Sequence, residues 1–165
     1  MASVYDLEYK FKLVRQYEAD GLDRAQEYRE YLRDAFDQRP NQEQIWMACL
    51  DIHNKVVCRK QIAVGLVGLV VFGMQDLFAP ALAPNVNASK IIMAHNHPSG
   101  DTTPSDADIK CTKRVKETGI ALGVPCVEHL IFGDRFACPN GVGYYSFAEA
   151  GFLKDDFEPE ELILR

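Results

Sequence analysis

Segment 95–108 constrains this chain more than any other, because it joins a strand end, a tight loop and a helix start. His95 and His97 follow an apolar run, and side chains two apart in a strand point to the same face. Both imidazoles can therefore bind one ion. Pro98 and Gly100 end the strand, and Asp108 falls in the first turn of an expected helix, where a carboxylate is favoured. Two histidines and one aspartate leave a tetrahedral ion one open position, which is typical of catalytic zinc.

The same segment has a purely structural interpretation. Ser105 and Asp108 fit a Ser-x-x-Asp capping box, and the two histidines would then be turn residues. A His-x-His-Pro sequence followed, after six residues, by Ser-x-x-Asp is much rarer by chance than either half alone. We therefore predict that His95, His97 and Asp108 bind Zn²⁺.

Composition limits the class of protein. A chain of 165 residues suits one domain with a real core, and a net charge of −6 disfavours a nucleic-acid partner. The acidic start with Asp6 and Glu8 does not fit a signal peptide, and the apolar stretch 62–72 is too short to span a bilayer. The five cysteines are scattered, with no C-x-x-C spacing, as in reduced cytoplasmic proteins. We expect a cytoplasmic protein with no membrane association.

Two amphipathic helices are expected between residues 4 and 36, hinged near Asp20 and Gly21. Their apolar faces must pack on the core or on a second copy of the chain, which would give a homodimer through these helices. The expected organisation is an N-terminal helical extension over 1–40, a domain over 41–153 and an acidic C-terminal tail over 154–165.

The rest of the chain predicts a mixture of strands and helices. Expected strands cover 43–51, 56–64 after a turn at 53–55, 91–94, 126–132 and 135–138, and expected helices cover 73–82 and 105–117, the latter capped by Gly119. This order is not a regular βαβ repeat. It predicts an α+β fold with a mixed sheet flanked by helices.

The motif resembles the signature of the JAMM (MPN, JAB1) zinc metalloprotease superfamily, in its RadC-like branch. The matching residues are His95, Asn96, His97, Pro98, Ser99, Gly100, Asp101, Pro104, Ser105 and Asp108. The likeness continues through segments 127–134 and 145–149 and covers roughly residues 41–153. It implies the JAMM/MPN fold, which is cytidine deaminase-like.

The resemblance also implies roles for single residues. Glu43 stands where the family has the glutamate that acts as general base. Ser105 would donate its hydroxyl to the developing oxyanion. Asp101 and His129 are candidates for orienting a ligand imidazole, although His129 equally fits a packed strand histidine.

The implied function is a zinc-dependent metallopeptidase or isopeptidase that hydrolyses an amide bond, in a peptide or at the C-terminus of a ubiquitin-like modifier. Two alternatives stay open: a non-catalytic MPN interaction module, and a RadC-type protein associated with DNA repair. The resemblance implies that longer RadC-like proteins have a helix-hairpin-helix DNA-binding unit in front of this domain, whereas this chain offers two acidic helices in that place. Direct nucleic-acid binding is therefore not expected.

Overall fold

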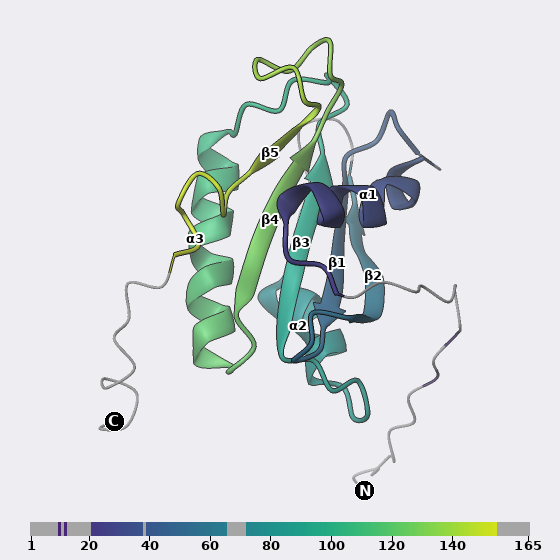
Figure 1. Cartoon of the computed structure of the whole chain (residues 1–165), viewed down its shortest axis with the longest axis vertical. Coiled ribbons are helices and arrows are strands. Elements are labelled where there is room, and N and C mark those ends of the chain that lie inside the picture. The colour runs from purple at the N-terminus through teal and green to yellow at the C-terminus, as the bar shows by residue number, and fades with distance from the viewer. Residues whose placement is uncertain (1–9, 11, 13–20, 38, 66–71, 155–165) are drawn as a thin grey trace, which may run out of the picture.

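The computed structural model describes residues 10, 12, 21–37, 39–65 and 72–154, and in them one sheet is flanked by helices on both faces (Figure 1). Its strands are β1 Gln44–Leu50, β2 Val56–Val64, β3 Lys90–Asn96, β4 Cys126–Phe132 and β5 Tyr144–Ser146. The helices are α1 Ala25–Phe36, α2 Met74–Leu82 and α3 Asp106–Ala121. The expected α+β class and mixed sheet are confirmed.

The strand order is β2-β1-β3-β4-β5, so β3 lies at the centre of the sheet. Strands β3 and β4 are parallel and are connected through α3, whereas the other neighbouring pairs are antiparallel. Chain connections at the carboxyl ends of parallel strands are the usual place for ligand sites in α/β sheets. Here the carboxyl end of β3 leads into the His-x-His loop and then into α3.

Alternation along β3 separates two cores. Ile92 and Ala94 pack with α1 on one face, whereas Ile91 and Met93 pack with α2 and α3 on the other. Figure 1 shows α1 in front of the sheet and α2 behind it. By the same alternation His95 belongs to the face of α2 and α3, and its neighbour Asn96 belongs to the face of α1.

The second expected N-terminal helix is α1, whose apolar side is buried against the sheet. Its buried residues are Ala25, Tyr28, Tyr31, Leu32, Ala35 and Phe36. This helix therefore packs on the protein's own core. Except for Lys10 and Lys12, the first expected helix lies outside the described residues, as do the segment 66–71 and the tail 155–165. Dimerisation through the N-terminal helices stays a prediction.

The end of α3 differs from expectation. Gly119 was predicted to cap the helix, but α3 continues through it to Ala121. A Cβ on Gly119 would lie 2.9 Å from the carbonyl oxygen of Val124, so glycine is needed for close packing rather than for ending the helix. Gly123, with φ of +68°, takes the left-handed conformation that follows the helix end.

The strand expected at 135–138 is also wrong, because these residues form a turn. The carboxylate of Asp134 accepts a hydrogen bond from Phe136 N at 2.7 Å, and its carbonyl accepts from Ala137 N at 3.1 Å. The last strand is instead β5, which pairs antiparallel with β4.

Two expectations from composition can be compared with the structure. All five cysteines, which lie in the described part of the chain, are free. Among the described residues, no helix combines the length and apolar character that crossing a bilayer requires.

Candidate metal centre

The three predicted ligands meet at the carboxyl end of β3. His95 is the penultimate residue of that strand, His97 follows its end, and Asp108 lies in the first turn of α3. The two Nε2 atoms are 3.1 Å apart. Asp108 Oδ1 is 3.2 Å from His95 Nε2, and Asp108 Oδ2 is 3.6 Å from His97 Nε2. One ligand atom from each residue lies within 4.8 Å of the others, so the group could hold a metal ion.

The helix cap fixes the carboxylate of Asp108. Ser105 Oγ accepts from Asp108 N at 3.2 Å, and Asp108 Oδ2 accepts from Ser105 N at 2.8 Å and from Ser105 Oγ at 2.6 Å. This reciprocal pair is a capping box. Asp108 can therefore cap the helix and also face the metal group, so the two interpretations of Ser-x-x-Asp are compatible. Burial disfavours the charged carboxylate, but hydrogen bonds with His95 and His97 lower the pKa of Asp108 well below its usual value.

A backbone carbonyl orients His97. Its Nδ1 lies 2.8 Å from the carbonyl oxygen of Asp101, which can only accept, so we infer that Nδ1 carries the hydrogen. In the neutral ring the lone pair is then on Nε2, facing the centre. Asp101 thus orients the ring through its backbone carbonyl. Its carboxylate instead accepts hydrogen bonds from Thr103 N and Oγ1.

A longer chain of hydrogen bonds orients His95. Thr112 Oγ1 donates to the carbonyl oxygen of Asp108 at 2.7 Å, so it must accept from His129 Nδ1, also at 2.7 Å. His129 Nε2 is then free to accept from His95 Nδ1 at 2.9 Å. Burial lowers the pKa of His129, which favours this neutral form. The lone pair of His95 is thereby also on Nε2.

This arrangement fits a divalent cation. Two Nε2 lone pairs and an anionic carboxylate face one point, and they repel one another unless a positive charge lies between them. The hydrogen bond to Asp108 raises the pKa of His97 although burial opposes it, so the site attracts positive charge. Two imidazoles and a carboxylate form a set that zinc accepts, with a coordination position left open.

The group lines a cavity of about 430 Å³. Its walls are formed by Glu43, Ile45, Phe72, Met93, His95, His97, Pro98, Ser99, Ser105, Ala107, Asp108, Cys111 and His129. Glu43 precedes β1 and is half-buried. Because Ile45 pairs with His95 in the antiparallel register, Glu43 lies beside the end of the ligand strand. Both residues predicted to act in catalysis, Glu43 and Ser105, thus lie in the same cavity as the three predicted ligands.

Thr112 is the residue of this site that the sequence analysis missed. Its only signal is its place one helical turn after Asp108, which sets its hydroxyl above the carbonyl of that ligand.

The Thr112→Val variant is expected to bind metal about tenfold more weakly, because His129 Nδ1 loses its acceptor and His95 loses its fixed orientation. Thr112→Ser keeps the hydroxyl and should bind like wild type. Competition with a chromophoric chelator measures both affinities. Equal affinities of Thr112→Val and wild type would show that the chain of hydrogen bonds does not support the centre.

Gly133 allows the loop after His97 to pack closely against the end of β4. A Cβ on Gly133 would lie 2.2 Å from the carbonyl oxygen of Gly100 and 2.5 Å from Thr102 Cγ2. Gly133→Ala is therefore expected to displace this loop, to destabilise the protein by about 1–3 kcal/mol and to weaken metal binding. Gly123→Ala meets no atom within 4 Å and costs only backbone strain of about 1 kcal/mol. Thermal unfolding and chelator competition on both variants check this, and a metal affinity that falls equally in both would contradict it.

The fold and this group define the class: an α+β domain with a candidate metal centre at the carboxyl end of its central strand. Residues 22–152 match the family model described as RadC-like JAB domain. The chain belongs to the RadC-like JAB domain family, as the motif had indicated.

Proteins from several bacteria are similar to this chain over part of its length. UPF0758 proteins from Caldanaerobacter subterraneus and Thermotoga maritima are 36% and 39% identical over 108 and 111 residues. These matches cover 65% and 67% of this chain and 46% of each relative. A UPF0758 protein from Clostridium perfringens is 41% identical over 94 residues, which are 57% of this chain and 40% of that relative. The chain thus spans less than half the length of these curated relatives.

Proposed function

We propose that this protein is a zinc-dependent metallopeptidase that hydrolyses an amide bond, either in an extended peptide or at the C-terminus of a ubiquitin-like modifier. The observation that supports it most is the meeting of His95, His97 and Asp108 with Glu43 in one cavity. A metal-binding group alone would serve a structural role equally well. A carboxylate beside an incompletely coordinated metal suits proton transfer instead.

A zinc ion held by His95, His97 and Asp108 would supply a Lewis acid for the amide carbonyl and would lower the pKa of a water molecule. Glu43 takes the proton of the attacking water and returns it to the leaving amine. Ser105 lines the cavity, and its hydroxyl donates to the carbonyl oxygen as negative charge develops there. For this the hydroxyl turns away from Asp108 Oδ2, to which it donates at 2.6 Å, while Ser105 N still holds that oxygen.

We also propose a location and a class of partner for the protein. Five free cysteines and the acidic chain fit a cytoplasmic protein without direct nucleic-acid contacts. The competing functions, a non-catalytic interaction module and a protein associated with DNA repair, become outcomes of one experiment.

The test uses the full chain in zinc-loaded, chelator-treated and zinc-restored forms. Substrates are ubiquitin with an amide-linked coumarin at its C-terminus, an unstructured peptide library read by mass spectrometry, and single-stranded DNA. We expect amide hydrolysis by the loaded form, its loss on chelation and its return with zinc. Loaded protein that cleaves none of the three substrates would overturn the proposal and favour the non-catalytic module. Metal-dependent cleavage of the DNA alone would overturn it and favour the repair role.

A further inference from the structure

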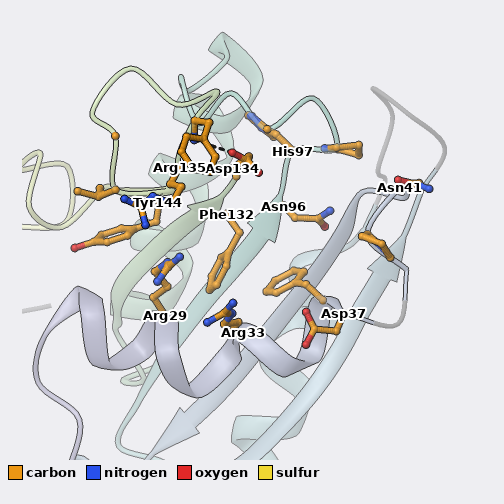
Figure 2. Close-up of a pocket in the computed structure, with 18 of the residues that line it drawn as sticks. Arg29, Arg33, Asp37, Asn41, Asn96, His97, Phe132, Asp134, Arg135 and Tyr144 are labelled. Carbon is orange, nitrogen blue, oxygen red and sulfur yellow. Dashed lines mark hydrogen bonds between the residues drawn. The ribbon is translucent and has the colours of Figure 1, made fainter.

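A second and larger cavity lies on the other side of His97. Its volume is about 860 Å³, and it is formed by α1, the ends of β3 and β4, and the segment 133–144 (Figure 2). His97 and Pro98 line both this cavity and that of the metal centre. The two cavities therefore meet at the carboxyl end of β3, one on each face of the sheet. An extended ligand that reached both cavities would cross this edge of the sheet.

Three arginines give the larger cavity its charge. Figure 2 shows Arg29 and Arg33 extending from α1 into it, with Arg135 on the loop across from them. Within the described part of the chain, none of the three forms an ion pair. Arg29 Nε is buried and has no hydrogen-bond partner. Its guanidinium lies 5.8 Å from the centre of the Tyr144 ring, which holds it at the wall of the cavity.

The carboxylates of the cavity do not neutralise these arginines. Asp134 closes its own turn by accepting from Phe136 N, and Asp37 is exposed at the end of α1. The protein as a whole has a net charge of −6, so unpaired arginines gathered beside the metal centre run against its overall charge. A planar guanidinium with free donors is the group that best binds a carboxylate.

Apolar surface accompanies the charge. Phe36 and Phe132 line the cavity with ring centres 4.6 Å apart. At its rim Phe136 is 89% exposed and Val142 is 49% exposed. Exposed aromatic side chains beside arginines are typical of surfaces that bind a peptide or protein.

We propose that this cavity binds acidic side chains of the substrate polypeptide, on one side of the amide bond that is cut at the metal centre. The position of the bond rests on the proposed function, whereas binding of the acidic segment does not. The polypeptide passes over the end of β3 at His97 and Pro98, with its carboxylates on Arg29, Arg33 and Arg135. A nucleic acid fits less well, because three arginines on a chain of net charge −6 can pair with a few carboxylates but do not form the extended basic surface that a phosphate backbone requires.

The test measures binding without cleavage, by fluorescence anisotropy on the full chain in the presence of chelator. The probes are a labelled peptide rich in glutamate, the same peptide with glutamine at those positions, and a labelled oligothymidylate. Wild type is expected to bind the glutamate peptide about tenfold more tightly than the glutamine peptide. The double variant Arg33→Ala/Arg135→Ala should lose this preference. Both residues are exposed, so the fold should tolerate the change.

The control is Lys113→Ala/Arg114→Ala, which changes the net charge equally on the exposed side of α3, outside both cavities. It should keep the preference. Equal binding of the two peptides, or a preference that survives in Arg33→Ala/Arg135→Ala, would overturn the proposal. Tighter binding of the oligothymidylate through the same arginines would also overturn it. A retained peptide preference without any amide hydrolysis would refute the proposed function and leave the acidic-peptide site standing.

Discussion

Glu43→Gln is expected to lower the rate of amide hydrolysis by about 10²- to 10⁴-fold while metal binding stays close to wild type. The glutamine side chain keeps the size of glutamate but cannot accept the proton of the attacking water. Glu43 lines the cavity without being one of the three grouped ligands, so its replacement leaves the metal group unchanged. Steady-state hydrolysis and zinc content, measured on the same preparation, check both parts.

The matched control is Glu117→Gln, an exposed residue of α3 outside both cavities. It should hydrolyse like wild type. A Glu43→Gln variant that contains zinc and retains most activity would assign the proton transfer to another residue. A variant that loses zinc would instead make Glu43 part of the metal site.

Asp108→Asn is expected to weaken zinc binding by more than about 100-fold, a larger loss than that caused by supporting residues. The neutral amide removes the negative charge that faces His95 and His97. The amide oxygen can still accept from Ser105 N and Oγ, but without the negative charge these hydrogen bonds are weaker, so we expect the cap to weaken by about 1 kcal/mol. Asp108 therefore contributes to both metal affinity and helix stability.

Metal analysis after purification and chelator competition give the affinity, and thermal unfolding gives the stability. Asp106→Asn is the control, because Asp106 is an exposed acidic residue in the same turn of α3. It should change neither quantity strongly. Full zinc occupancy in Asp108→Asn would mean that the three residues do not form the metal site.

Regular elements with strong patterns could be predicted from the sequence. The hairpin at 53–55 and the strand 56–64 follow from a turn between two apolar runs, and the structure has them there. The strand prediction for segment 135–138 was wrong, because its apolar residues suggested a strand whereas the side chain of Asp134 closes a turn. The short strand β5 was missed because its partner β4 determines it and its own three residues contain no clear alternation.

In the candidate site, too, residues of a local motif could be predicted from the sequence, whereas residues brought in by packing could not. Three ligands within one local motif could be predicted from spacing, and the structure brings them together. Glu43 came only from the family resemblance, because its distance from the motif depends on the register of β1 against β3. Thr112 could not be predicted, since its role depends on His129 from β4 lying beside α3. Nor did the sequence show that Arg29 and Arg135 share a cavity, which requires α1 to pack across the sheet.

The parallel connection from β3 through α3 has a consequence for folding. All three grouped ligands lie between His95 and Asp108, so they can meet through contacts that are local in the chain, before His129 of β4 orients His95. Glu43 joins them only when β1 pairs with β3 across a long sequence separation, a step that closes a large loop and is slower. A nascent or partly folded molecule would thus bind metal before it acquires its base. Hydrolytic activity would then report completed folding, and bound metal would not.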